Sequence, residues 1–181
     1  MIPTLYEPFR KWSKKGSIII FSDPHFNDET CKRMDPNWPE AEEIVKRINE
    51  KCQPNDTFVC LGDVGDAAYV KEIRAKYKVL LTGNHDRVSD YRGLFDEFYT
   101  GPLFIADRIL LSHEPIAGLN WCVNIHGHDH GNKYTFPEEC RHVNLAANIC
   151  DFTPMNLGKE IKNGLLSGIK DLHRQVIDGR M

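Results

Sequence analysis

The segment Ser17-Ile18-Ile19-Ile20-Phe21-Ser22-Asp23-Pro24-His25 places four consecutive apolar residues shortly before an aspartate and a histidine. A short, mostly β-branched run of this kind predicts a strand that is buried on both faces. In α/β sheets, ligands bind beyond the carboxyl ends of the strands, which is where Asp23 and His25 would lie. We therefore predict an α/β fold in which the ends of strands carry a functional site.

The same pattern recurs along the chain, so we expect several such strands. Further apolar runs end at Gly, Asp, Asn or His over residues 57–61, 78–81, 108–111, 122–125 and 141–145. Strands that finish at polar residues are typical of buried strands that feed the loops of a site. The six runs therefore outline the sheet framework of the protein.

Apolar residues at helical spacing fall around these runs. Residues 41–48 and 67–77 each show this spacing, and Asp66 is well placed to cap the second segment. A third helix is expected over Lys159–Ile177, where Gly164 and Gly168 could divide it into two. Strands that alternate with helices, followed by a strand-rich half, predict a partly parallel sheet.

Size and charge limit the classes of protein that this chain can represent. Its 181 residues suit one domain, and we detect no internal repeat or linker. No apolar run exceeds four residues, which argues against a transmembrane helix or secretion signal and leads us to expect a cytoplasmic protein. The net charge of −3 gives no general reason to expect nucleic acid or a membrane as partner. Six cysteines without a Cys-x-x-Cys pair favour reduced thiols.

Five short blocks at the ends of the apolar runs carry side chains that bind metal ions. They are Asp23-Pro24-His25, Gly62-Asp63, Gly83-Asn84-His85-Asp86, Ser112-His113-Glu114 and His126-Gly127-His128-Asp129-His130. Carboxylate and amide oxygens mixed with imidazoles suit Mn²⁺, Fe²⁺ or Zn²⁺ better than Ca²⁺ or Cu²⁺. Each block alone could be an ordinary turn, but five strand ends that each supply a ligand indicate a site for two ions. Paired ions of this kind are a common device for attacking phosphate esters.

In their order, these blocks resemble the calcineurin-like metallophosphoesterases. The family pattern is Asp-x-His, Gly-Asp, Gly-Asn-His-Asp/Glu, His and Gly-His-x-His, and the resemblance extends over residues 17–156. It implies an α/β fold of four layers, α/β/β/α, with two mixed sheets. It also implies that residues 1–181 form a single domain without a cap domain, since only 14 residues separate His113 from His128.

The resemblance further implies which residues bind the metal ions. One set of three would hold the first ion, another set would hold the second, and one carboxylate would bridge them and reduce their mutual repulsion. These residues are Asp23, His25 and His130 in the first set, Asn84, His113 and His128 in the second, and Asp63 as the bridge. We expect two divalent cations, Mn²⁺ first, with Fe²⁺, Zn²⁺ or Ni²⁺ as alternatives.

The histidine-rich block permits two ligand pairs from its residues alone. Either His126 and His128 or His128 and His130 could bind metal. The family pattern Gly-His-x-His fits only the stretch that begins at Gly127 and therefore favours the second pair. His128 is a ligand in both interpretations.

His85 and Asp86 are the expected catalytic residues. By the resemblance, His85 is not a ligand but faces the phosphate and its leaving group, where an imidazolium could protonate the departing oxygen. Asp86 would hold the second ring nitrogen of His85. The candidate cations for phosphate binding are Arg33, Arg87 and Arg141, because a guanidinium group matches phosphate geometry.

We therefore expect a binuclear metal-dependent hydrolase of phosphodiesters or phosphomonoesters, in which a hydroxide that bridges the metals attacks phosphorus. The expected partner is a small phosphoester, with a slight preference for diesters because the site has no cap. Nucleic acid is not indicated, since basic and aromatic residues cluster only at residues 10–15. No membrane partner is expected, and the sequence does not predict the oligomeric state.

The alternative is a non-catalytic metal-binding scaffold of the same fold. Scaffold proteins that resemble this family typically lack a ligand or the histidine of the Gly-Asn-His block. This chain retains all the expected ligands as well as His85, which favours the enzyme.

Overall fold

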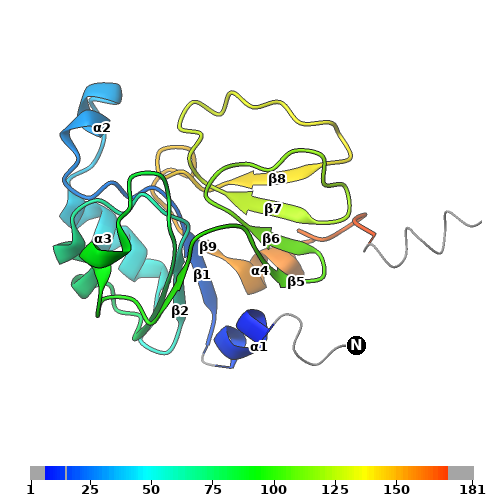
Figure 1. The fold of residues 1–181 in the computed structure, drawn as a ribbon, viewed down its shortest axis with the longest axis horizontal. Helices are drawn as coiled ribbons and strands as arrows, with labels where there is room; N and C mark the ends of the chain where they lie inside the picture. Colours follow the sequence, from blue (N-terminus) through cyan, green and yellow to red (C-terminus); the bar gives the residue numbers. More distant parts are fainter. Residues whose placement is uncertain (1–6, 15, 171–181) are drawn as a thin grey trace, which may run out of the picture.

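Two β-sheets form the framework of the computed structural model, which describes residues 7–14 and 16–170 (Figure 1). The first sheet has the strand order β4-β3-β2-β1-β9, and the second has the order β5-β6-β7-β8. The strands are β1 (Ile18–Phe21), β2 (Thr57–Cys60), β3 (Tyr77–Leu81), β4 (Glu97–Tyr99), β5 (Leu103–Ala106), β6 (Ile109–Leu111), β7 (Val123–His126), β8 (Arg141–Asn144) and β9 (Met155–Asn156). Only β9 in the first sheet and β5 in the second are antiparallel to their neighbours, so both sheets are mixed.

The two sheets share one hydrophobic core. Alternate residues of the first sheet, such as Ile20 and Val59, pack against residues of the second, such as Leu111 and Ile125, and all four are fully buried or nearly so. Helix α1 (Glu7–Ser13) and helix α4 (Leu157–Lys162) contribute to the same cluster through buried side chains. Burial of apolar area at about 25 cal/mol per Å² makes this core the main contribution to stability.

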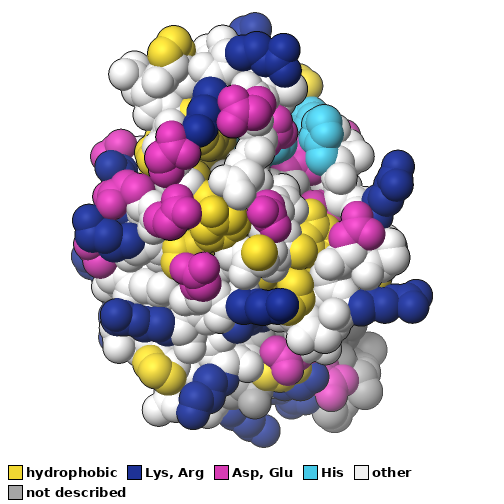
Figure 2. Space-filling model, turned by 90° about the vertical axis from the view of Figure 1, so that its left-hand side faces the viewer, with side chains coloured by type: hydrophobic (Ala, Val, Ile, Leu, Met, Phe, Trp, Pro, Cys, Tyr) yellow, Lys and Arg dark blue, Asp and Glu magenta, His cyan; other side chains and the backbone are white. Residues whose placement is uncertain are grey.

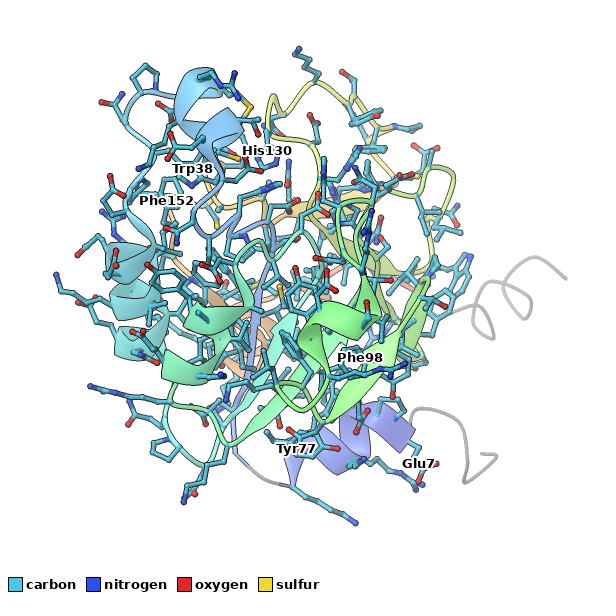
Figure 3. The ribbon with its side chains drawn as sticks, turned by 60° about the vertical axis from the view of Figure 1, so that its left-hand side comes forward. Glu7, Trp38, Tyr77, Phe98, His130 and Phe152 are labelled. Carbon is cyan, nitrogen blue, oxygen red and sulfur yellow. The ribbon has the colours of Figure 1, made fainter. Side chains whose placement is uncertain are left out.

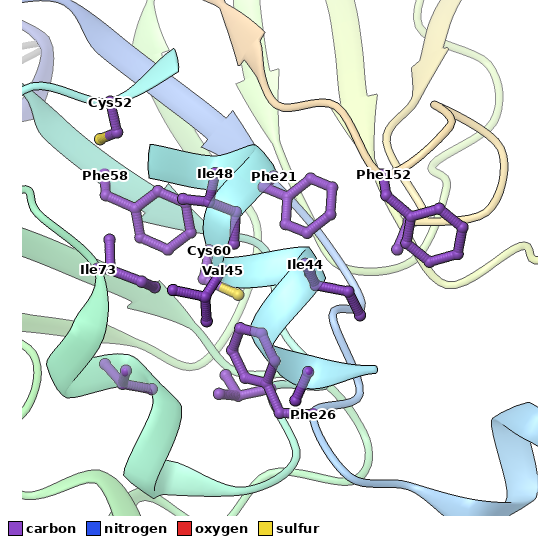
Figure 4. Close-up of a cluster of buried hydrophobic side chains, with 14 of the residues drawn as sticks. Phe21, Phe26, Ile44, Val45, Ile48, Cys52, Phe58, Cys60, Ile73 and Phe152 are labelled. Atoms are coloured by element: carbon purple, nitrogen blue, oxygen red, sulfur yellow. The ribbon is translucent and has the colours of Figure 1, made fainter. Parts of the chain in front are cut away.

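Helices cover the outer face of the first sheet. The amphipathic helix α3 (Ala41–Lys51) packs Ile44 and Ile48 against Phe21 and Phe58 (Figure 4). The 3₁₀ helix η1 (Ala67–Glu72) and the short helix α2 (Glu29–Met34) extend this layer. In Figure 1, α2 and α3 lie on the side of β1 and β2 that faces away from β5 to β8.

Loops cover the outer face of the second sheet in the described part of the chain (Figure 1). The amide of Asn124 donates to Ser112 Oγ at 2.8 Å and accepts the N–H of Ile116 at 2.8 Å. The ring of Phe136 stacks on His142 with 3.3 Å between the centroids. Among the described residues, Asn124 is therefore hydrogen-bonded within this face, whereas the ring nitrogens of His142 have aromatic packing but no hydrogen-bond partner.

The structure confirms the α/β class with two mixed sheets. The six predicted strands are present within one or two residues of the expected ends. Three short strands were not predicted: β4, β5 and β9. No helix among the described residues is long and apolar enough to cross a membrane. The six cysteines are unpaired.

Two helix predictions need correction. The segment 67–77 is not one helix: η1 ends at Glu72, and Tyr77 begins β3, where it pairs with Thr57 of β2. Pairing with a central strand has overridden the helical spacing. Asp66 does cap η1, since its side chain accepts the N–H of Ala68.

The C-terminal helix also differs from the expectation. Helix α4 begins at Leu157, before the predicted start, and ends at Lys162. Gly164 adopts a φ of +98°, a conformation that ends a helix and that glycine adopts most easily. Residues 171–177 of the predicted helix lie outside the described residues.

Candidate metal centre

The candidate ligands meet because parallel strands end at the same edge of a sheet. Asp23 and His25 follow β1, Asp63 follows β2 and His113 follows β6. The loops are tied together by backbone hydrogen bonds, from Asp23 N–H to Gly62 O at 3.0 Å and from His25 N–H to Asp63 O at 3.1 Å. In the second sheet, Gly127 N–H donates to His113 O at 2.9 Å. The loops of the site are therefore held by backbone hydrogen bonds that continue the hydrogen-bond ladders of the sheets.

Several candidate ligands have a strained backbone. Asp23, His25, Asp63 and His128 have φ values of +54°, +42°, +51° and +64°. This left-handed region costs roughly 1–3 kcal/mol per strained residue and persists where the surrounding structure enforces it, commonly at functional sites. Gly127 shows why one position must be glycine: a Cβ atom there would overlap the carboxylate of Asp23.

Asp23, His25 and His130 form a group that we call the first cluster. One ligand atom from each residue lies within 4.8 Å of the others. Nε2 of His130 is 3.8 Å from Asp23 Oδ1. Asp23 and His25 are 0% and 6% exposed, so this cluster is sheltered from solvent.

Asn84, His113 and His128 form a second cluster. The amide oxygen of Asn84 lies 2.9 Å from His113 Nε2 and 3.1 Å from His128 Nδ1, and these two nitrogens are 3.1 Å apart. Asp63 stands between the clusters, because its Oδ2 is 3.4 Å from His113 Nε2 and 3.8 Å from His25 Nε2. The seven residues expected as ligands are thus brought together in two groups that Asp63 joins.

Residues behind the clusters orient three of the imidazoles. Nδ1 of His25 lies 3.2 Å from Asp28 Oδ2, and Nδ1 of His130 lies 2.9 Å from Asn148 Oδ1. Nδ1 of His113 faces the Leu61 carbonyl at 2.9 Å. These oxygens accept a proton from Nδ1, which leaves Nε2 unprotonated toward the site, as metal-binding histidines require. Sequence reasoning did not identify these three partners.

Charge and burial shift the pKa values of the central groups. Burial would raise the pKa of Asp63, but hydrogen bonds from His113 and the His85 backbone N–H outweigh it and lower the pKa to about 2. Burial lowers the pKa of His25. Burial would also lower the pKa of His113, but Asp63 and Asp23 raise it to about 8. Asp63 is therefore charged across the physiological range.

An unpartnered carboxylate oxygen tests whether a cation fits here. Asp23 Oδ2 accepts the N–H of His128 at 2.9 Å, but the buried Oδ1 has no hydrogen-bond partner. A buried carboxylate oxygen without a partner is costly unless a cation or a donor meets it. Two carboxylates, one amide oxygen and four imidazoles are a donor set that suits Mn²⁺, Fe²⁺ or Zn²⁺. The residues therefore fit a divalent cation.

His85 is exposed at the mouth of the site. Its backbone N–H donates to Asp63 Oδ1 at 2.9 Å, and its ring lies edge-on to His25 with 5.7 Å between the centroids. The prediction that Asp86 holds the ring of His85 is wrong. The Asp86 carboxylate accepts the backbone N–H groups of Asp63, Val64 and Gly83 at 2.8, 3.0 and 2.9 Å. Asp86 therefore fixes the two ligand loops to each other.

Other candidates from the sequence lie outside the clusters. His126 points to the outer face of the second sheet, where its ring meets His142 at 5.5 Å, whereas His128 and His130 reach the site. Arg141 begins β8, at the end of the sheet opposite the site, and donates to the Leu165 carbonyl at 2.7 Å. Arg33 and Arg87 are exposed and do not line the site pocket.

Trp38 supports the first cluster from behind. Its buried ring lies edge-on to His25 and His130, with centroid distances of 6.1 and 5.7 Å, and to Phe152 at 5.1 Å. Figure 3 shows Trp38 and His130 side by side below α2. Aromatic packing of this kind restricts the rotation of both imidazoles.

The fold and the site together define a metal-binding α/β protein whose ligands come from the strand ends of two mixed sheets. Residues 16–161 match the family model of the calcineurin-like phosphoesterases, so the chain belongs to that family. No sequence among the curated proteins matches the chain.

Solved structures add support for the fold. The protein of unknown function AQ665 from Aquifex aeolicus superimposes with a TM-score of 0.68 at 23% identity, over 81% of this chain and 98% of that chain. A single mutant of Vps29 from Entamoeba histolytica matches with a TM-score of 0.41 at 18% identity, over 73% of this chain and 75% of that chain. The first similarity supports the same fold.

Proposed function

We propose that this protein is a phosphoester hydrolase that uses two divalent cations, Mn²⁺ first, with Fe²⁺, Zn²⁺ or Ni²⁺ as alternatives. Membership in the calcineurin-like phosphoesterase family supports the reaction class. The observation that carries the proposal is the position of Asp63, whose Oδ2 lies 3.4 and 3.8 Å from one histidine of each cluster. A carboxylate so placed can serve both ions.

The chain's own residues would hold the ions as two half-sites. The first cluster would bind one ion and the second cluster the other, with Asp63 shared between them. When bound, the ions would supply the Lewis acidity that activates water and neutralises charge on the phosphoryl group. Oδ1 of Asp23, which has no hydrogen-bond partner, would gain a positively charged partner when the ion binds.

His85 is the proposed catalytic residue. It lines the pocket beside His25, His128 and His130, but its ring belongs to neither cluster. As imidazolium it would donate a proton to the leaving oxygen or stabilise the phosphoryl charge. The hydrogen bond from its own backbone N–H to Asp63 fixes its loop relative to both clusters. Asp86 is a positioning residue, since it holds the backbone of the Asp63 and Gly83 loops.

The substrate is proposed to be a small phosphoester. The pocket beside the clusters has a volume of about 280 Å³ and no Lys or Arg among its lining residues. That volume is near the lower end of the roughly 300–1,000 Å³ found for small-molecule sites. It accommodates both phosphomonoesters and one end of a phosphodiester, with the slight preference for diesters expected from an uncapped site.

Hydrolysis by chelator-stripped protein tests the proposal. Rates on bis-p-nitrophenyl phosphate and p-nitrophenyl phosphate are measured before and after addition of Mn²⁺. We expect activity only with the ion, and the ratio of the two rates gives the preference for diesters. The Asp63→Asn variant, purified in the same way, controls for a contaminating phosphatase. Protein that binds two ions and hydrolyses neither ester would contradict the proposal and favour the non-catalytic scaffold.

A further inference from the structure

The pocket beside the candidate metal centre has two unlike walls. One wall carries the ionisable groups His25, Asp63, His85, His128 and His130. The other wall is the short helix α2, which presents Thr30, Cys31 and Met34. In Figure 2, histidine side chains reach the surface near the top of the molecule, at the level of α2. The wall formed by Thr30, Cys31 and Met34, which we call the α2 wall, has no role in the mechanism above.

The α2 wall is uncharged. Met34 is one of few large apolar side chains exposed in the described chain, at 51% exposure. The Thr30 hydroxyl is already engaged, because it donates to Asp28 Oδ1 at 2.6 Å. Cys31 is buried and contributes a small, soft side chain to the wall. An exposed methionine on the rim of a pocket is suited to contact with an apolar or aromatic ligand.

The cations of α2 are turned away from the pocket. Lys32 Nζ pairs with the carboxylate of Glu40 at 2.7 Å, and Arg33 Nε donates to the Glu29 carbonyl at 3.4 Å. A second phosphate or carboxylate on the substrate would lose water against this wall without gaining a positive partner. The wall therefore favours a substrate with one phosphoryl group and an apolar substituent.

A single carboxylate fixes the α2 wall relative to the first cluster. Asp28 Oδ2 contacts His25 Nδ1 at 3.2 Å, while Oδ1 accepts the backbone N–H of Thr30 at 2.8 Å and caps α2. The helix therefore begins at the same residue that orients an expected metal ligand. This link gives the wall a defined position relative to a phosphoryl group bound at the clusters.

We propose that the α2 wall binds the organic group of the substrate and selects an uncharged, apolar substituent, with Met34 as the main specificity-determining residue. The inference rests on the proposed function, because it takes the phosphoryl group to be bound at the two clusters. The substrate class is then a phosphoester that carries one phosphoryl group and an aryl or alkyl substituent, in contrast to a nucleoside polyphosphate. The contact is made in the ground state, so it contributes to binding more than to the chemical step.

Binding of phosphonates to the Mn²⁺-loaded protein tests the inference without requiring turnover. The affinities of phenylphosphonate and methylphosphonate are compared by calorimetry in the wild type, Met34→Ala and Arg33→Ala. We expect the wild type to prefer the phenyl compound about tenfold, which is the effect of burying part of one ring. Met34→Ala should lose most of this preference. Arg33→Ala, a matched change on the same helix, should retain it.

Three results would each overturn the inference. The first is an unchanged phenyl preference in Met34→Ala, and the second is the absence of any preference in the wild type. The third is weaker binding of both phosphonates in Arg33→Ala, which would show that a cation of α2 recognises the ligand. Thermal melts check that α2 variants remain folded, as expected for an exposed side chain. Failure of the proposed function is seen separately, as absence of ester hydrolysis by protein that still binds phenylphosphonate.

Discussion

The two clusters use similar ligands but differ in their surroundings. The first is enclosed: Asp23 and His25 are 0% and 6% exposed, and Trp38 packs behind His25 and His130. The second opens toward solvent, since Asn84 is exposed and His128 is half-buried. The difference is one of packing: the first cluster has the more rigid setting, whereas both clusters meet the substrate pocket, the first through His25 and His130 and the second through His128.

Removal of the residue shared by both clusters should have the largest effect. We expect Asp63→Asn to lower the affinity for both ions and to reduce turnover by about a thousandfold or more, because the shared charge that offsets two dications is lost. Asparagine retains the shape of the side chain and tolerates the left-handed φ of +51°, so the fold should persist. Metal analysis and ester hydrolysis measure the two effects. Wild-type turnover with two ions bound would remove Asp63 from its bridging role.

His85→Ala should separate ion binding from chemistry. The ring lies outside both clusters, so we expect two ions to remain bound while kcat falls by about a hundredfold, the usual contribution of a positioned acid. The measurements are metal content and kcat on p-nitrophenyl phosphate. Loss of an ion in this variant would instead make His85 a ligand, and an unchanged kcat would leave it without a role.

Asp28→Ala should weaken the first cluster alone. Loss of the hydrogen bond to His25 Nδ1 is expected to reduce the affinity of the first cluster for its ion by about tenfold. Asp66→Ala is a matched control, because it removes a similar aspartate cap from η1. Asp28→Asn should restore much of the affinity, since its amide oxygen can still accept the Nδ1 proton. Equal losses of metal affinity in the Asp28→Ala and Asp66→Ala variants would show that Asp28 acts only as a helix cap.

A difference in pH dependence should distinguish the clusters more finely. The pKa of His113 is raised to about 8, so below that pH an ion at the second cluster must displace a proton. The affinity of the second cluster for its ion should therefore fall about threefold for each half unit by which the pH is lowered. Burial lowers the pKa of His25, so that imidazole is already neutral and the first cluster should show little change above pH 6.5. Mn²⁺ titrations of His130→Ala and Asn84→Ala, which retain the second and first cluster respectively, compare the two dependences. The same dependence of Mn²⁺ affinity on pH in both variants would contradict this difference between the clusters.

The framework of the fold follows closely from the sequence. The strands β1, β2 and β6 are mostly apolar and buried along their whole length, and β3 is buried from Val79 onward, which makes these four recognisable. The signal is weaker in β7, which carries two polar side chains, and in β8, which is exposed at Arg141 and half-buried beyond it. The three strands that were not predicted all lie at sheet edges. The strand β4 begins at Glu97 and is only half-buried, and β9 has only two residues, so both lack such a signal, whereas the apolar run Leu103–Ala106 of β5 carried it and was missed. Tyr77 shows the opposite error: its helical spacing from Ile73 was real, but strand pairing with Thr57 decided its conformation.

The ligands of the site were easier to predict from the sequence than the residues that orient them. The ligand types stand at the ends of apolar runs and can be read there. Asn148 is far along the chain from most of the site, and Leu61 contributes only a backbone carbonyl. Neither residue type therefore indicates, from the sequence alone, that it orients a histidine. Asp28 did have a recognisable sequence pattern, because Asp28-Glu29-Thr30 is typical of the start of a helix. The contacts of Asp86 with three backbone N–H groups depend on loop geometry that only the tertiary structure supplies.

Anomalous diffraction from crystals soaked in Mn²⁺ is the most direct test of the central claim that two ions share Asp63. We predict two peaks, one among Asp23, His25 and His130 and one among Asn84, His113 and His128, each within coordination distance of the Asp63 carboxylate. A single peak, or two peaks of which only one contacts Asp63, would contradict the account.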